Sequence, residues 1–162
     1  MAANIVVPTR RMAFKEQLLL GLQTNRFFKG YKMCPGGKNA GQDPRVAARR
    51  ELLEETNLIA YERSLQHVGI IQSYVNGEPL FDVDVFRAPD CEGVHQSRPF
   101  FPSEWVDTDK LPWRSMVNSD PAWLMYAIEG MWFGLLIAEF DQAPDKVTYR
   151  VDPSFERRLP PL

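Results

Sequence analysis

Apolar and polar residues alternate over much of the chain in short runs rich in β-branched and aromatic side chains, a pattern typical of β-strands. Asn76-Gly77, a strong signal for a β-hairpin, separates two of these runs, and a second hairpin turn is expected at 142–145. Pro8 interrupts the first run and favours an edge position for it, because proline has no backbone N–H. The runs predict strands at 5–14, 17–21, 65–75, 80–88, 104–106, 132–140 and 147–151, and a short strand that ends the loop at 24–34.

Two segments carry helix signals instead. Asp43-Pro44 joins an N-cap residue to a proline at the first helical position, and predicts a helix from Arg45 to about Thr56 that is ended by Asn57. Asp120-Pro121 predicts a second helix that runs to about Met131. The apolar sides of these helices are expected to be Val46, Ala47, Leu52 and Leu53 in the first, and Trp123, Leu124, Ala127 and Ile128 in the second.

The order of the elements is strands, helix, strands, helix, strands, which predicts a mixed sheet with helices packed on it, in the α/β or α+β class. The length of 162 residues suits one domain. That domain is expected to span residues 1–152. Residues 153–162, which contain Pro153 and end in Leu-Pro-Pro-Leu, are expected to form a surface tail.

The composition excludes several classes of protein. There are 19 basic and 21 acidic residues, so the formal net charge of -2 provides no bulk attraction for nucleic acid or anionic membranes. The longest apolar stretch, residues 131–138, is far shorter than the ~20 residues of a membrane span. Residues 1–8 lack the pattern of a signal peptide. Cys34 and Cys91 form no CxxC pair and favour buried thiols, although spacing alone leaves a disulfide open. We therefore expect a cytoplasmic protein.

Three glutamates in the first predicted helix are the most informative polar group. Glu51, Glu54 and Glu55 are spaced i, i+3 and i+4, so they project from one helix face and repel one another. A divalent cation such as Mg²⁺ converts that repulsion into binding, because it prefers carboxylate, water and phosphate oxygens. Gly36 and Gly37, earlier in the chain, allow the backbone to approach a metal ion or a phosphate closely. A solvated acidic helix face is the common alternative for such a pattern.

The residues around this helix resemble the Nudix box, in which a glycine precedes an Arg-Glu-x-x-Glu-Glu core at a fixed spacing. A chance match of such a pattern is expected only about once per million starting positions. Gln42 replaces the first glutamate of the box and cannot be anionic, whereas Asn57 replaces its late glycine and tolerates a left-handed cap. The residues at the box positions are Gly36, Gln42, Arg50, Glu51, Leu52, Glu54, Glu55, Asn57 and Leu58.

The resemblance implies the Nudix fold, an α/β/α sandwich in the α+β class with a mixed β-sheet between the Nudix helix and a C-terminal helix. Outside the box the chain is most similar to the MutT-like branch, whose members hydrolyse oxidised purine nucleoside triphosphates. In that branch an asparagine before the glycines and a Trp-Pro-Asp-Asp stretch hold the base. Here Met33 replaces the asparagine, and of the four-residue stretch at 117–120 only Asp120 is retained. We therefore expect altered base recognition, so a preference for 8-oxoguanine is not implied.

For the chemistry, the resemblance implies that Glu51, Glu54 and Glu55 hold Mg²⁺, with Mn²⁺ as an alternative, together with a backbone carbonyl of Gly36 or Gly37. Water activated by the metal attacks a phosphorus of a nucleoside diphosphate linked to another group, and one of the glutamates takes the proton. A triphosphate would yield a nucleoside monophosphate and pyrophosphate. Degeneration into a nucleotide-binding sensor and hydrolysis of a nucleotide sugar or dinucleotide remain as alternative functions.

The remaining basic and acidic candidates have less certain roles. Lys38 either neutralises phosphate charge or is a solvated loop lysine. Arg50 is expected to orient a carboxylate rather than to contact substrate. Glu104, the carboxylate next to Trp105, is a further candidate metal ligand or base.

Four residues are candidates for the base pocket. Phe27 and Trp123 offer aromatic faces, on which a base stacks with about 1–3 kcal/mol, while Met33 and Asp120 hold positions that match base-contacting residues of the resembling branch. Asp120 is alternatively a helix N-cap, and the two aromatic residues are alternatively ordinary core. The expected partner is a small-molecule nucleotide, with no membrane and no bulk nucleic acid. Monomer and homodimer both remain open.

Overall fold

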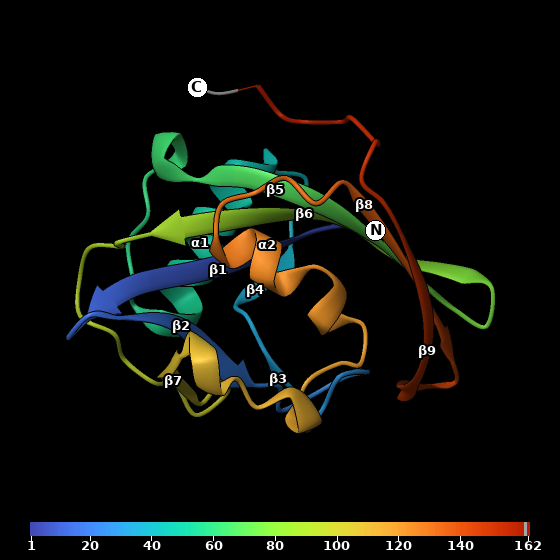
Figure 1. Cartoon of the computed structure of the whole chain (residues 1–162), viewed down its shortest axis with the longest axis horizontal. Coiled ribbons are helices and arrows are strands. Elements are labelled where there is room, and N and C mark those ends of the chain that lie inside the picture. The colour runs from blue at the N-terminus through green and yellow to red at the C-terminus, as the bar shows by residue number, and fades with distance from the viewer. Residues whose placement is uncertain (161) are drawn as a thin grey trace.

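Nine strands form one mixed sheet in the computed structural model, which describes residues 1–160 and residue 162 (Figure 1). Their order is β3-β2-β1-β6-β5-β8-β9, with β4 paired to β1 and β7 paired to β2. Parallel pairs join β1 to β6 and β5 to β8, which makes the sheet mixed. The strands are β1 (Ala2–Met12), β2 (Lys15–Leu22), β3 (Lys32–Met33), β4 (Gly36–Lys38), β5 (Gln66–Val75), β6 (Glu78–Pro89), β7 (Ser103–Asp107), β8 (Leu135–Asp141) and β9 (Ala143–Asp152).

Two helices cover opposite faces of this sheet. In Figure 1, α1 (Pro44–Thr56) lies behind the sheet and α2 (Leu124–Ile128) lies in front of it. Val6 and Leu52 belong to the core under α1, whereas Val7 and Leu124 belong to the core under α2. Neighbouring residues of β1 therefore contribute to different cores, as the alternation of side chains along a strand requires. The predicted α+β sandwich, with a mixed sheet between two helices, is confirmed.

The position expected for the first strand is wrong. β1 lies inside the sheet, between β2 and β6, and not at an edge. Pro8 is tolerated because one flank of β1 changes partner there: β4 pairs with residues 3–5 and β2 with residues 9–12. On the other flank, Pro8 is in register with Ala88 of β6. A proline between two pairings costs little on the flank where the ladder is already interrupted.

Both hairpins are present, but the second turns earlier than expected. Asn76 and Gly77 have φ values of 51° and 82°, the left-handed conformation that a tight β5–β6 turn requires. The β8–β9 turn is made at Gln142, with φ of 63°, and β9 already begins at Ala143. The expected turn at 142–145 is therefore reduced to its first residue, and the strand absorbs the rest.

Helix α1 begins and ends where the sequence predicts. The Asp43 carboxylate accepts a hydrogen bond of 2.9 Å from the backbone N–H of Arg45, and Asn57 ends the helix with φ of 63°. Its buried face differs from the prediction, because Val46 and Leu53 are exposed. A face that repeats every three or four residues includes positions 45, 48, 52 and 56 and leaves positions 46 and 53 on other sides. The buried residues are Arg45, Ala47, Ala48, Leu52 and Thr56.

The second helix is shorter than predicted. A 3-10 turn at Asp120–Ala122 precedes it, Trp123 leaves the helical conformation with φ of −133°, and α2 ends at Ile128. The predicted apolar side is nevertheless buried throughout: Trp123, Leu124, Ala127 and Ile128. The apolar pattern identified the buried residues correctly, whereas the local backbone decided the length of the helix. The other 3-10 turns are Glu62–Ser64, Thr108–Lys110 and Trp113–Ser115.

The segment after β9 is largely exposed but is attached to the domain. The backbone N–H of Leu159 donates to Nδ1 of His67 at 2.9 Å, and the buried Arg45 donates to the carbonyl of Pro160 at 2.8 Å. Figure 1 shows this segment crossing the molecule above β5. The tail expected at 153–162 includes residue 161, which lies outside the described residues.

Within the described part of the chain, no helix is long and apolar enough to cross a membrane. Cys34 and Cys91 are both free thiols, the first buried and the second partly buried. The reading of the two cysteines as unpaired is therefore confirmed.

Candidate functional site

A cavity of about 890 Å³ lies beside α1, bounded by the start of β1, by β4, by the loop between β2 and β3, and by the segment that leads into α2. Most residues singled out in the sequence lie on its wall. They are Phe27, Met33, Gly36, Gly37, Lys38, Glu51, Glu54, Glu55, Asp120 and Trp123. We refer to Glu51, Glu54 and Glu55 as the acidic part of the cavity, and to Phe27, Phe28, Trp123 and Phe140 as its aromatic part.

Strand β4 lies directly against the acidic face of α1. The backbone N–H of Gly36 donates to Oε1 of Glu55 at 2.8 Å. A Cβ atom on Gly37 would lie 2.6 Å from Cδ of Glu51, closer than real contacts allow. Glycine at these positions therefore lets the backbone meet the carboxylates without an intervening side chain.

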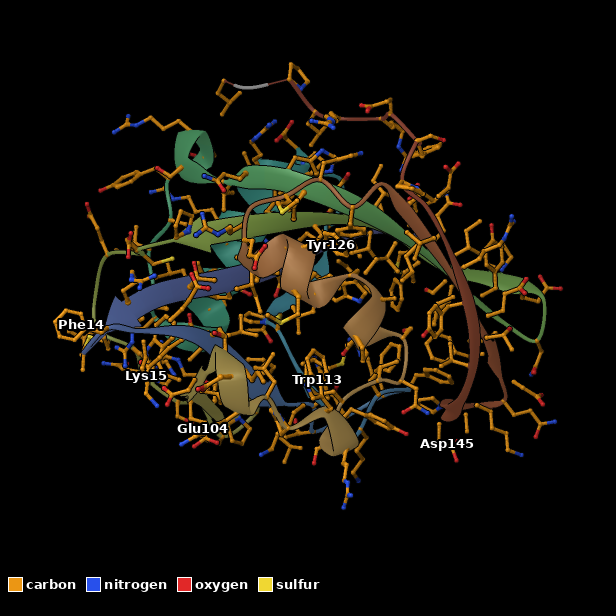
Figure 2. All side chains as sticks on the ribbon, in the orientation of Figure 1. Phe14, Lys15, Glu104, Trp113, Tyr126 and Asp145 are labelled. Carbon is orange, nitrogen blue, oxygen red and sulfur yellow. The ribbon has the colours of Figure 1, made fainter. Side chains whose placement is uncertain are left out.

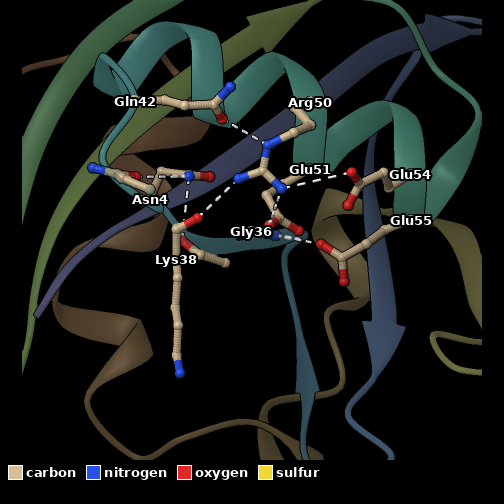
Figure 3. Close-up of polar contacts among 10 residues, drawn as sticks. Asn4, Gly36, Lys38, Gln42, Arg50, Glu51, Glu54 and Glu55 are labelled. Atoms are coloured by element: carbon tan, nitrogen blue, oxygen red, sulfur yellow. Dashed lines mark hydrogen bonds and ion pairs between the residues drawn. The ribbon is translucent and has the colours of Figure 1, made fainter.

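Arg50 connects the acidic part to the end of β4 and to the loop that follows it (Figure 3). Its Nη1 donates to Oε1 of Glu51 at 3.0 Å, its Nη2 to the carbonyl of Lys38 at 3.0 Å, and its Nε to Oε1 of Gln42 at 2.7 Å. Oε1 of Glu54 is 3.6 Å from Nη1. Arg50 does not line the cavity, so its geometry matches a role in orienting carboxylates. Gln42 makes its contact to Arg50 with a neutral amide.

Burial raises the pKa of two glutamates of the acidic part, Glu51 and Glu55. Burial raises the pKa of Glu55 to about 8, the Gly36 N–H opposes this shift, and the neighbouring glutamates add to it. The pKa of Glu51 is also raised by burial, and the cation of Arg50 opposes that shift. A further cation at this place would favour the ionised forms of both groups.

The donor chemistry of the acidic part suits a hard divalent cation such as Mg²⁺, which binds carboxylate oxygens. In the described structure, no three side chains of the usual ligand types converge on one point as they stand. Arg50 holds Glu51 and contacts Glu54, while Gly36 holds Glu55. Because the Glu54 side chain is 55% exposed and its contact with Arg50 is long, it is free to turn towards an ion. The residues fit a cation after that rearrangement.

Asn4 of β1 supports the glycine strand and was missed in the sequence. Its side chain is almost fully buried, and its Nδ2 donates to the carbonyl of Gly37 at 3.2 Å and to Oδ1 of Asn39 at 3.0 Å. Its own Oδ1 has no hydrogen-bond partner among the described residues. A polar residue inside an apolar strand was the available signal, since buried polar side chains are retained where they bond to something.

Among the four candidates for the base pocket, Asp120 is the one with a titratable side chain. It is buried, and Nε1 of Trp123 donates to its Oδ1 at 3.2 Å. Burial raises the pKa of Asp120 to about 7, with the Trp123 hydrogen bond opposing the shift. Asp120 is therefore present in both protonation states near neutral pH. The N-cap interpretation is wrong, because Ser119 precedes the 3-10 turn and the Asp120 carboxylate bonds to the indole instead.

The aromatic part is built from segments distant in the chain. Phe27 and Phe28 lie edge-on to Phe140 of β8, with ring centroids 5.4 and 5.5 Å apart. Trp123 packs against Phe133 at 5.7 Å and also lines the cavity, so it belongs both to the core and to the wall. Met33 completes this side from β3.

Lys38 and Glu104 have contrasting positions. The Lys38 side chain extends away from the Arg50 network in Figure 3 and lines the cavity. Glu104 lies on β7, in register with Leu20 of β2, and is labelled on the outside of that strand in Figure 2. It is exposed and does not line the cavity. The structure therefore does not bring Glu104 to the other candidate ligands, because the β2–β7 pairing directs it elsewhere.

Comparisons with known proteins agree with this geometry. A family model described as the NUDIX domain matches residues 2–126. A protein of Danio rerio described as an oxidized purine nucleoside triphosphate hydrolase is 37% identical over 109 residues, which cover 66% of this chain and 69% of that protein.

Two solved structures illustrate the shared fold. The MutT protein of Bacillus halodurans superposes with a TM-score of 0.73 at 24% identity, covering 94% of this chain and 98% of that chain. The NUDIX domain of Shewanella oneidensis NrtR in complex with ADP ribose superposes with a TM-score of 0.57 at 14% identity, covering 67% and 73%. At these identities the likeness concerns the fold alone.

Proposed function

This chain belongs to the Nudix hydrolase family, and from that premise we propose that it hydrolyses nucleoside triphosphates to nucleoside monophosphates and pyrophosphate with Mg²⁺. Oxidised purine deoxynucleotides such as 8-oxo-dGTP are the first candidates, because the zebrafish relative is described as acting on that class. The observation that carries the proposal is that one cavity wall holds both the acidic part and an aromatic part containing a buried carboxyl group. The acidic part suits a phosphate chain that is bound to a metal ion, and the aromatic part suits a base.

In the proposed reaction, the residues of the acidic part bind the cation and Arg50 positions them. Glu51, Glu54 and Glu55 would hold Mg²⁺, with Mn²⁺ as a substitute, and the carbonyl of Gly36 or Gly37 would add an oxygen. When bound, the cation lowers the pKa of water and neutralises phosphate charge. Arg50 keeps Glu51 in place through their 3.0 Å hydrogen bond.

In the acidic part, Glu55 is the glutamate best suited to take a proton from water. Burial raises the pKa of Glu55 to about 8, which supports this choice because the group would bind a proton more tightly than an exposed carboxylate does. A bound cation would lower this value, so the group would be ionised when the site is loaded. Lys38 lines the same cavity and would pair with phosphate oxygens.

The aromatic part would hold the base. Phe27 and Trp123 supply apolar faces, and Asp120 supplies a carboxyl group that accepts a hydrogen bond when ionised and donates one when protonated. Because the pKa of Asp120 is about 7, raised by burial, both options are available near neutral pH. Met33 offers no hydrogen bond to a base, so recognition would depend on stacking, on Asp120 and on other polar side chains of the wall such as Ser73 and Ser119.

Met33 also favours a second candidate function, hydrolysis of another nucleoside diphosphate derivative such as a nucleotide sugar. Met33 takes the place of a hydrogen-bonding asparagine, and a pocket with fewer hydrogen-bonding groups discriminates less between bases. A nucleotide sensor without turnover is less favoured, because Gln42 maintains its hydrogen bond to Arg50 and the three glutamates remain in place.

The test is a turnover panel with Mg²⁺, containing ordinary and oxidised purine and pyrimidine triphosphates, nucleotide sugars and dinucleotides, with chromatographic identification of the products. We expect a triphosphate to yield its monophosphate and pyrophosphate, and chelation of the metal to abolish turnover. Faster cleavage of a nucleotide sugar than of every triphosphate would establish the second candidate instead. Absence of turnover across the panel would overturn both enzymatic proposals.

A further inference from the structure

A cation on the loop between β2 and β3 has no part in the roles described above. Arg26 lines the cavity, and the only other basic side chain on the described wall is Lys38. No ion pair within 4 Å involves Arg26 among the described residues. Arg26 is exposed and lines the same cavity as Glu51, Glu54 and Glu55. Arg26 therefore lines the same cavity as the acidic part without an ion pair to it in the described structure.

The loop that carries Arg26 is anchored on both sides. The next two residues, Phe27 and Phe28, pack against Phe140 in the aromatic part. On the preceding side, the Thr24 hydroxyl donates to the carbonyl of Phe100 at 2.7 Å. The loop is closed by the N–H of Gly30, which donates to the carbonyl of Gln23 at 2.8 Å. The backbone of this loop is therefore held by its own contacts rather than by the guanidinium group.

Arg26 itself adopts the left-handed conformation, with φ of 63°, which is uncommon for a residue with a long side chain. Asparagine or glycine would adopt it more readily. Local backbone strain of this kind is retained where the surrounding structure imposes it, and it is frequent at ligand sites. The backbone conformation therefore does not explain why this residue is an arginine. The place of its charge on the cavity wall offers an explanation.

Arg26 shares one cavity wall with both the acidic part and the aromatic part. Arg26 directly precedes Phe27 of the aromatic part in the chain, and Glu51 of the acidic part lines the same wall. A nucleotide with its base among the aromatic residues and its terminal phosphates at the acidic part would pass its phosphate chain between them. The carboxylates repel phosphate oxygens, so a nearby fixed cation would offset that repulsion.

We propose that Arg26 binds the phosphate chain of the nucleotide where it passes from the aromatic part to the acidic part. A guanidinium group presents several N–H donors in a planar fork that suits phosphate oxygens. The inference rests on the proposed function, since it assumes a substrate with a phosphate chain. It assigns Arg26 a role in binding, and it leaves the reaction at phosphorus to the glutamates.

The test replaces Arg26 in two ways. Arg26→Asn removes the charge with a residue that tolerates positive φ, and Arg26→Lys keeps the charge but removes the planar fork. Lys29→Asn is the matched control, because Lys29 is an exposed cation on the same loop and does not line the cavity. The measurements are kcat and KM for the best substrate of the panel, and calorimetric Kd values for inorganic tripolyphosphate with Mg²⁺ and for the parent nucleoside.

We expect Arg26→Asn to raise KM and the Kd of tripolyphosphate by about tenfold or more, the loss typical of a hydrogen bond to a charged group. The nucleoside Kd and kcat should change by less than about threefold, because neither depends on this contact. Arg26→Lys should recover part of the loss, and Lys29→Asn should resemble the unmodified protein.

Binding of Mg²⁺ alone separates this role from structural damage. Removing a cation from the cavity wall should leave Mg²⁺ affinity unchanged or increase it, while phosphate affinity falls. A damaged site would lose affinity for both.

The inference would be overturned if Arg26→Asn bound tripolyphosphate and substrate as the unmodified protein does. It would also be overturned if the variant lost as much affinity for Mg²⁺ as for tripolyphosphate. In both cases, turnover by the unmodified protein would leave the proposed function standing. If the unmodified protein bound neither tripolyphosphate nor any nucleotide, both would be overturned.

Discussion

The two parts of the cavity are built in different ways. The acidic part comes from five consecutive positions of one helix, 51–55, and is held by Arg50 of the same helix and Gly36 of the adjoining strand. The aromatic part joins the loop after β2, the turn before α2, and β8. The first depends on helix periodicity and two caps, whereas the second depends on how the sheet brings three distant segments together.

This difference indicates a division of labour. A cation and a phosphate chain need oxygen and charge at fixed spacing, which a helix supplies locally. A base needs a shaped apolar wall with few polar groups, which only packing between segments supplies. Substitutions in the acidic part should therefore affect the rate of the reaction, and substitutions in the aromatic part should affect the choice and affinity of the substrate.

The largest effect is expected from the acidic part. Glu54→Gln or Glu55→Gln should lower kcat by at least about 10²-fold, because each change removes a candidate metal ligand or proton acceptor. Steady-state kinetics with saturating Mg²⁺ would measure it. Glu104→Gln makes the same chemical change outside the cavity and should retain the rate of the unmodified enzyme. Normal rates in both cavity variants would contradict a catalytic role and would favour the alternative that the glutamates form a solvated helix face.

In the aromatic part, Asp120→Asn should raise KM by about tenfold, the effect of losing a hydrogen bond to a charged group, with a smaller change in kcat. The pH dependence of KM between pH 6 and 8 should also flatten, because the pKa of Asp120, raised to about 7 by burial, no longer contributes. KM measured across that range provides the comparison. A tenfold loss in kcat at constant KM would contradict the assignment of this part to binding.

The same variant should change stability in a pH-dependent way. The pKa of Asp120 is higher in the folded protein than the ordinary value of about 3.9 in an unfolded chain. Its contribution to stability is therefore fully present below pH 3.9 and is lost as the pH rises through about 7. Relative to the unmodified protein, Asp120→Asn should gain thermal stability between pH 4 and pH 7. Equal melting-temperature differences at pH 5 and pH 8 would count against a buried, protonated Asp120.

The smallest effect is expected at the edge of the acidic part. Gln42→Glu would place a carboxylate on Nε of Arg50, where an amide oxygen now accepts at 2.7 Å. Because this contact is exposed, it should be worth less than about 1 kcal/mol, and turnover should rise by no more than about threefold. Weaker competition from Arg50 should also free Glu54 and lower the Mg²⁺ concentration needed for half-maximal rate. A higher Mg²⁺ requirement would show that the added charge competes with the metal-binding residues.

Predictions from local pattern were the most accurate. Helix α1 begins with Asp43 and Pro44 and is ended by Asn57, as predicted, because capping residues act on the nearest backbone groups. The spacing of Glu51, Glu54 and Glu55 likewise placed all three on the cavity wall. The edge position of β1 was wrong, because Pro8 is accommodated by a change of strand partner that local pattern does not reveal. The buried face predicted for α1 was wrong at Val46 and Leu53, because both project from sides of the helix that do not face the sheet.

By itself, the sequence determined the mixed sheet with its two helices, the acidic face of α1 and the glycines that face it, because hydrophobic period, caps and residue spacing act over a few residues. Tertiary structure decided which distant groups share the cavity. It brought Asp120 and Trp123 to the wall with Phe27, placed Arg26 on the same wall as Glu51, and left Glu104 on the outside of β7. Those outcomes depend on strand order and register, which join segments that no local pattern connects.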